Sequence, residues 1–368
     1  VGTMTIYRYF AMRFLRSFLA TLAAFMVLSV MIETVEQLRR FASDSMSFAT
    51  GFGLSLLAVP RNLYDILPLV VLLATIVLYL SLARTSELTV ARAAGLSALR
   101  VTTAPVLVSM LIGVVAVAAV NPIIAATGER YERITQRLDG GVISTLSVGG
   151  EGLWLRQPSL AGQTVIHAAR VDPDGTRFDE VAFFGFDEFG RALYRIEAES
   201  ARLGDGAWEI GPGKRWLFTG RGNPEANARD FDSFALPSDL TQRKIRDSVG
   251  EPADVPIWDL PGFIRQLEAA GFSATAHRLH FQSELAKPFL MAAMILAGAA
   301  FLLRPARFGR LGVMVLAAVL AGAALFFLRN FAKVMAEAGS IPVVAAAWAP
   351  PTAGLLIGLW LMLQFEDA

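Results

Sequence analysis

Six long segments without a charged residue constrain the fold of this chain more than any other feature. A helix that crosses a membrane needs about 20 mostly apolar residues, and arginine side chains at its ends can extend a shorter run. Between residues 128 and 287 no further segment of this kind occurs. The sequence therefore predicts an α-helical membrane protein with six transmembrane helices, three before and three after a polar insert, at residues 17–32, 66–83, 101–127, 288–303, 311–328 and 338–365.

The basic residues of the short connections predict the orientation of these helices, because such residues concentrate on the cytoplasmic side. With a cytoplasmic N-terminus, more of them lie inside (Arg8, Arg13, Arg16, Arg84, Arg92, Arg100, Arg304, Arg307 and Arg310) than outside (Arg39, Arg40, Arg61, Arg329 and Lys333). Both termini are then cytoplasmic, and the insert lies in the periplasm or outside the cell. The first segment is interpreted as a retained anchor, since Glu33 and Glu36 follow it without a convincing signal-peptide cleavage site.

The insert, at residues 140–255, changes to short segments rich in β-branched and aromatic residues, separated by turn signals. Strands are expected at 153–156, 164–171, 180–186, 192–201, 207–210, 215–219 and 231–236. This spacing favours an all-β domain, an antiparallel sandwich or jelly roll. A connector helix follows at 256–273, with Asp259 expected as its N-cap and Gly271 just past its end. The first three membrane helices then occupy 1–139 and the last three 274–368.

Several kinds of chemistry are excluded or disfavoured by composition. The chain has no cysteine and three histidines, so a zinc–thiolate site or a cysteine nucleophile is excluded. Its net charge of +1 does not favour nucleic acid binding. A phosphate-binding P-loop is missing, because Trp208 and Arg215 flank Gly213-Lys214 where a glycine and a serine or threonine are needed. We therefore expect no catalytic residue, no metal and no bound cofactor. A metal at His277 and His280 is weighed against an interfacial helix face, which is favoured.

Charged and aromatic residues beside the predicted helices are the candidate binding residues, because an ionisable group near a membrane helix is costly to desolvate. Arg39 and Arg40 form either a basic patch for anionic headgroups or, with Glu36, a salt-bridged helix end. The aromatic residues of the first and fifth segments either pack against protein or lipid, which is favoured, or form a surface that binds a ligand; they are Phe14, Phe18, Phe25, Phe326 and Phe327.

A short amphipathic helix is predicted in the loop at 85–95. Thr85 or Ser86 can cap it, Glu87 lies in its first turn where a negative charge is favourable, and Gly95 ends it. Its apolar residues Leu88, Val90 and Ala91 suit either of two roles. The helix docks in the cleft of another protein, or it lies on the membrane surface.

Taken in order along nearly the whole chain, these features resemble the LptF/LptG permeases of the lipopolysaccharide export ABC transporter. The resemblance lies in the arrangement of six helices around a β-rich insert, Ser86-Glu87-Leu88 in the loop at 85–95, Leu285-Ala286-Lys287-Pro288 and the proline-containing loop before the last segment. Of the two paralogues it is closer to LptG, through the stretches Val35-Glu36-Gln37-Leu38-Arg39-Arg40 and Gly339-Ser340-Ile341-Pro342.

The resemblance implies a function in the bacterial inner membrane. It implies a heterodimer with an LptF-like permease, an LptB-like ATPase dimer that uses ATP and Mg²⁺, and a periplasmic LptC-like partner. The permease would extract lipopolysaccharide from the outer leaflet and pass it through a periplasmic jelly roll. Burial of acyl chains is worth about 0.8 kcal/mol per CH₂ group, so extraction needs the energy that the ATPase supplies.

The resemblance also implies site residues, at the positions of this sequence that match the family pattern. The ATPase would contact Ser86, Glu87, Leu88 and Arg92, and lipid would contact Arg39, Arg40, Phe18, Phe25, Leu67, Phe326, Phe327 and Arg329. This chain departs from the family pattern at Glu33, where a further basic residue is expected, and at Arg329-Asn330, where a more acidic pattern is expected. The alternative is a membrane-anchored periplasmic scaffold or receptor that is not coupled to ATP hydrolysis. A lipid-modifying enzyme is disfavoured, because the sequence offers no polar catalytic cluster.

Overall fold

The computed structural model describes most of the chain. The chain divides into two compact units, a helix unit formed by residues 1–131 with 278–368 and a sheet unit formed by residues 132–277. The described residues are 2–40, 48–138, 146–149, 152–159, 162–172, 175–204, 206–218, 223–238, 240–241, 245, 251–303 and 311–366.

Long apolar helices make up the helix unit, as the uncharged segments predicted. Within the described residues six helices are long and apolar enough to cross a membrane, at Met4–Arg40, Leu67–Arg84, Ala98–Thr135, Thr275–Leu302, Leu311–Glu337 and Val343–Gln364. The helices are α1 (Gly2–Arg40), α2 (Phe48–Asp65), α3 (Leu67–Arg84), α4 (Glu87–Ala93), α5 (Ala98–Val115), the π-helical turn η2 (Ala116–Val120), α6 (Asn121–Leu138), α9 (Thr275–Leu302), α10 (Leu311–Glu337) and α11 (Val343–Glu366).

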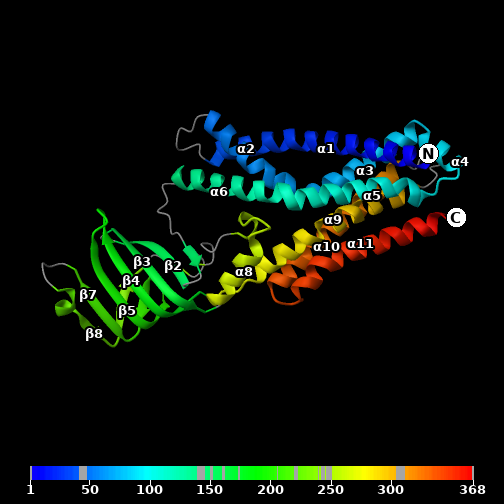
Figure 1. Cartoon of the computed structure of the whole chain (residues 1–368). Helices are drawn as coiled ribbons and strands as arrows, with labels where there is room; N and C mark the ends of the chain where they lie inside the picture. The colour runs from blue at the N-terminus through cyan, green and yellow to red at the C-terminus, as the bar shows by residue number, and fades with distance from the viewer. Residues whose placement is uncertain are drawn as a thin grey trace. The chain divides into compact units, whose positions relative to one another are not determined.

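The core of the helix unit forms around α3 and α9. Side chains of α3 such as Val70 and Tyr79 are fully buried, and most of α9 is enclosed. A methyl group added at Gly113 of α5 would lie 2.6 Å from the Cα atom of Pro288, so α5 and α9 approach at backbone distance. Figure 1 shows α1 running beside α3 and α5, and α10 beside α11. Large apolar side chains of α1, α10 and α11 stay exposed, as in helices that face lipid or a partner.

The sheet unit is built on one antiparallel sheet. Its described strands run in the order β1-β2-β3-β4-β5-β6-β9, and β7 pairs with β5 and β8; the long strands β2 to β5 are seen in Figure 1. The bounds are β1 (Leu146–Gly149), β2 (Gly152–Ser159), β3 (Gly162–Val171), β4 (Arg177–Asp187), β5 (Ala192–Leu203), β6 (Ala207–Ile210), β7 (Gly213–Leu217), β8 (Arg229–Phe231) and β9 (Phe234–Pro237). The antiparallel β character of the insert is confirmed, and the jelly-roll topology stays a prediction.

An aromatic cluster forms the core of this sheet. Burial alternates along β3 and β4, as expected for strands with one covered face. Trp208 is fully buried, and its ring meets those of Phe178 and Phe183 edge-on at centroid distances of 4.8 and 5.8 Å. Its indole N–H donates to Oε1 of Gln157 at 3.2 Å, so the polar atom of this large side chain is also satisfied.

Two details of the sheet differ from the prediction. The single strand expected at 231–236 is wrong, because the chain bends at Asp232-Ser233 and forms β8 and β9 on different partners. β1 was not expected at all. Thr219, the expected end of one strand, lies outside the described residues.

The helix α8 (Leu260–Ala269) precedes α9, within the predicted connector. Asp259 occupies the N-cap position, but its side chain makes no capping hydrogen bond. A capping side chain needs extended backbone at that residue, whereas Asp259 is helical, with φ −89° and ψ −20°. The end of the helix is as expected: Gly271 has φ +92°, and the N–H of Val171 on β3 donates to the carbonyl of Ala270 at 3.0 Å. Two short 3₁₀ turns, η3 (Pro224–Asn227) and η4 (Pro252–Asp254), complete this unit.

Candidate functional site

The short helix α4 forms in the loop where the sequence predicted it, and its first residue is Glu87. Ser86 stands at the N-cap position with φ +58°, and its side chain makes no capping hydrogen bond. The expected Ser86 cap is therefore wrong, because left-handed backbone is not the extended conformation that a capping side chain needs. Thr85 instead donates to the carbonyl of Ser81, in the last turn of α3. Gly95, at φ +81°, follows the end of α4 as expected.

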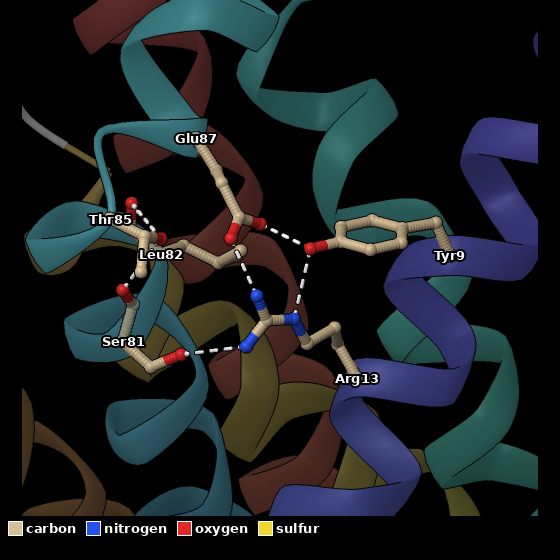
Figure 2. A network of polar contacts seen from close by, with 6 residues as sticks. All are labelled: Tyr9, Arg13, Ser81, Leu82, Thr85 and Glu87. Atoms are coloured by element: carbon tan, nitrogen blue, oxygen red, sulfur yellow. Dashed lines mark hydrogen bonds and ion pairs between the residues drawn. The ribbon is translucent and has the colours of Figure 1, made fainter.

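Glu87 is the centre of a polar network that joins three helices (Figure 2). Nη2 of Arg13 lies 2.5 Å from Oε1 of Glu87, and the Tyr9 hydroxyl donates to Oε2. Nε of Arg13 also donates to the Tyr9 oxygen at 2.9 Å, and its Nη1 lies 3.5 Å from Oγ of Ser81. Tyr9 and Arg13 are four residues apart on α1, so both reach the same side of that helix. The network thus ties α1 to α4 and to the end of α3.

The same contacts explain the electrostatics of Glu87. The hydrogen bond from Tyr9, with further help from Thr85 and Arg13, lowers the pKa of the Glu87 carboxyl, and burial opposes this shift. The side chains of Arg13 and Glu87 are 32% and 30% exposed. Water therefore reaches the pair, and its strength is that of a partly screened ion pair rather than a buried one.

The other residues predicted to contact an ATPase lie at different depths. Leu88 is 8% exposed and packs into the core of the helix unit, so its side chain anchors α4. Arg92 is partly exposed in the last turn of α4, where the helix dipole stabilises a positive charge. Val90 is 67% exposed. Between α4 and the start of α1 lies a groove of about 520 Å³, lined by Thr5, Ile6, Tyr9, Phe10, Thr85, Glu87, Val90, Ala91, Ala94 and Leu96.

Two of the predicted lipid contacts line one apolar cavity inside the helix unit. Phe18 of α1 and Leu67 of α3 border a cavity of about 410 Å³, together with Tyr64 and residues of α5 and η2. Phe18 and Leu67 are also buried, so they pack against neighbouring helices as well as lining the cavity. Phe25 is partly buried against the same core. Phe14, which belongs to the same aromatic stripe, is fully buried and therefore packs within the protein.

Of the predicted phosphate contacts, Arg39 and Arg40 lie at the exposed end of α1, and Arg329 lies within α10 and is partly buried. Nε of Arg39 lies 3.9 Å from a carboxylate oxygen of Glu36, with side chains 81% and 56% exposed. The salt-bridged helix end that was weighed for Glu36 is therefore seen at Arg39, and Arg40 is the last residue of α1. On α10 the guanidinium of Arg329 lies 6.0 Å from the centre of the Phe326 ring. Beside them Phe327 is 71% exposed.

A second charged cluster lies in the interior of the helix unit. Nζ of Lys287 is 2.6 Å from Oε1 of Glu284, and both side chains are almost fully buried. The Tyr64 hydroxyl donates to Oε2 of Glu284, and the Lys287 ammonium sits 3.3 Å from the centre of the Tyr64 ring. From the sequence, Lys287 was named only within the stretch Leu285-Ala286-Lys287-Pro288, and no pairing with Glu284 or Tyr64 was predicted. The spacing of three residues between Glu284 and Lys287, beside an apolar run, was the available signal.

The partners of Glu87 were likewise missed, since Tyr9 was not considered and Arg13 was used only to predict the orientation of the chain in the membrane.

Within the part of the chain that the structure describes, no group of three or more histidine, cysteine or acidic side chains gathers that could hold a metal ion. The rings of His277 and Phe263 pack against each other, with their centroids 5.2 Å apart.

The sheet unit has a hollow of about 750 Å³ bordered by His167, Glu180, Val181, Ala182, Glu197, Ala198, Glu199, Pro212, Gly213, Lys214, Asp230, Phe231 and Asp232. Several charged side chains border this hollow, among them Glu180, Glu197 and Lys214.

Comparison with known proteins covers both units. The family model "Lipopolysaccharide export system permease LptF/LptG" matches residues 8–364. "Lipopolysaccharide export system permease protein LptG" of Escherichia coli (strain K12) is 25% identical over 363 residues, 97% of each chain. The protein of the same name from Haemophilus influenzae is 22% identical over 374 residues, 99% of each chain. With its apolar helices and antiparallel sheet, the chain belongs to the LptF/LptG family of lipopolysaccharide export system permeases.

Proposed function

We propose that this chain is the LptG-type permease subunit of an ATP-driven lipopolysaccharide exporter in a bacterial inner membrane. Its termini are cytoplasmic, its six helices span the membrane in two groups of three at 1–139 and 274–368, and its sheet unit is a periplasmic jelly roll at 140–255 reached through the connector at 256–273. It extracts lipopolysaccharide from the outer leaflet and passes it through the sheet unit to an LptC-like partner.

One observation carries this proposal beyond the family assignment. The short helix α4 joins the membrane helices α3 and α5, presents Val90 to solvent and borders an open groove. A partner that docks on α4 would also be linked to α1, because Glu87 of α4 is paired with Arg13 of α1. Because the sequence has no P-loop of its own, the proposed partner is an LptB-like ATPase dimer that binds ATP and Mg²⁺. The second membrane subunit is an LptF-like permease.

The lipid path follows from the predicted contacts. Arg39 and Arg40 at one end of α1, and Arg329 of α10, would meet the phosphates of lipopolysaccharide, since guanidinium groups bind phosphate oxygens well. The apolar side chains Phe18, Phe25, Leu67, Phe326 and Phe327 would contact acyl chains. Lipid would enter beside α1 of one subunit and α10 of the other.

Purification from the native membrane in mild detergent, followed by mass spectrometry, tests the assembly. We expect an ABC ATPase, a second six-helix permease and bound lipopolysaccharide. Recovery of the chain alone, or with periplasmic proteins only, would support a membrane-anchored scaffold instead.

Glu87→Ala tests the coupling role in the reconstituted complex. We expect impaired transport and ATPase coupling with the fold intact, because a partly exposed ion pair is worth under about 1 kcal/mol. Normal complex assembly and normal lipid release by this variant would contradict the coupling role.

A further inference from the structure

Both carboxylate oxygens of Glu87 are used within this chain. Oε1 is paired with Arg13 and Oε2 accepts the hydrogen bond of Tyr9, and Figure 2 shows the side chain reaching from α4 toward α1. In this conformation the carboxylate is directed at another helix of its own subunit. A role confined to direct contact with an ATPase would not need these two partners.

The backbone before Glu87 adds a second, independent observation. Ser86 has φ +58°, which non-glycine residues seldom adopt. Such backbone persists where the surrounding contacts hold it, and it concentrates at switches and functional sites. Here it turns the chain sharply between α3 and α4, so that the first residue of α4 meets α1.

On the other side of the network, α1 connects it directly to the membrane interior. Phe14 and Phe18 follow Arg13 within about two turns of one continuous helix. Phe14 is fully buried, and Phe18 lines the apolar cavity of about 410 Å³. A displacement of Arg13 along or around the helix axis therefore reaches this cavity without crossing a loop.

We propose that Tyr9, Arg13 and Glu87 form a latch between α1 and α4, through which a movement of α4 displaces α1 and the cavity that α1 lines. The latch rests on the proposed function, and it assigns Tyr9 and Arg13 as positioning residues that act through Glu87. Nη1 of Arg13 also lies 3.5 Å from Oγ of Ser81, so the latch includes the end of α3 as well as α1 and α4.

Charge reversal in the reconstituted complex tests the latch, with ATP hydrolysis and lipid released per ATP as separate readouts. We expect Arg13→Glu and Glu87→Arg each to lower lipid release per ATP about fivefold, and the double variant to recover to within about twofold of the unmodified complex. A docking residue that only touches the ATPase would behave differently: Arg13→Glu would have little effect, and the double variant would be as poor as Glu87→Arg.

Arg8→Glu is the matched control, since Arg8 lies on the same helix with an exposed side chain outside the network. It should release lipid normally. Tyr9→Phe is a second variant that removes only one hydroxyl, and it should lower lipid release per ATP in the same direction, by about twofold.

The outcomes separate the latch from the function on which it rests. Normal coupling in Arg13→Glu, or a double variant that recovers less than half of the loss, overturns the latch and leaves the exporter intact. An unmodified complex that releases no lipid overturns the proposed function, and the latch with it.

Discussion

The helix unit holds two ion pairs of similar length in different surroundings. Lys287 and Glu284 are 2.6 Å apart with side chains 2% and 3% exposed, whereas Arg13 and Glu87 are 2.5 Å apart with side chains 32% and 30% exposed. Both pairs also involve a tyrosine, Tyr64 in the first and Tyr9 in the second. The distance between the charges is nearly the same, so burial is what distinguishes them.

Burial decides what each pair can do. Breaking a buried pair leaves a charge without water or a partner, which is strongly destabilising. Breaking a partly exposed pair returns both charges to water at little cost. The pair at Lys287 is therefore suited to fix the packing of α2 against α9, whereas the pair at Glu87 can be broken at little cost in stability.

Removal of the buried positive charge should have the largest effect on stability. Lys287→Met leaves the buried Glu284 carboxylate without its positive partner, so we expect the free energy of unfolding to fall by about 3–5 kcal/mol. Chemical unfolding of the purified chain in detergent measures it. The double variant Glu284→Leu, Lys287→Met is the control and should recover most of the loss; equal instability of the two variants would show that the charge itself is not the cause.

Removal of the tyrosine hydroxyl at the buried pair should cause the second largest loss of stability. Tyr64→Phe keeps the ring beside Lys287 but removes the hydroxyl that donates to Glu284. Loss of a hydrogen bond to a buried charged group costs about 1–3 kcal/mol. The same unfolding experiment checks it, and Tyr9→Phe is the matched variant at the exposed pair, for which we expect a smaller change. Equal losses in the two variants would contradict the assigned difference in burial.

A pH dependence should follow from the exposed pair, with a smaller amplitude. The pKa of Glu87 is lower in the folded chain than its ordinary value of 4.5, so its charged form stabilises the fold above that value. This contribution is lost as the pH falls below 4.5 and through the lower folded pKa. We expect a change under about 1 kcal/mol, seen as a difference between the unfolding curves of the unmodified chain and Glu87→Gln. A difference that grew on acidification would have the wrong sign.

The smallest effect is expected at the end of α1. Arg39 and Glu36 are 3.9 Å apart and largely exposed, so Arg39→Ala should change the free energy of unfolding by no more than a few tenths of a kcal/mol. If Arg39 binds lipopolysaccharide phosphate, the same variant should still weaken lipid loading, measured as lipid recovered with the purified complex. A large loss of stability would show instead that Arg39 supports the helix.

Local pattern was sufficient for much of the fold. Long uncharged runs predict helices because apolar side chains must leave water along the whole segment, and alternating strands between turns predict an antiparallel sheet. The helix at Glu87 and its end at Gly95 were also predictable, since glycine readily adopts the backbone that ends a helix. Caps were less predictable: Ser86 and Asp259 have the right side chains, but tertiary packing gave them backbone conformations in which those side chains do not cap.

The sequence by itself determined that this chain has apolar helices on either side of a β-rich insert, and it placed Glu87 on a short helix between two of them. Only the tertiary structure decided what Glu87 touches, because Arg13 is 74 residues away along the chain. It likewise decided that Tyr64, 220 residues from Glu284, completes the buried pair. Hydropathy and turn residues act over a few neighbours, whereas ion pairs depend on which helix faces meet when the core packs.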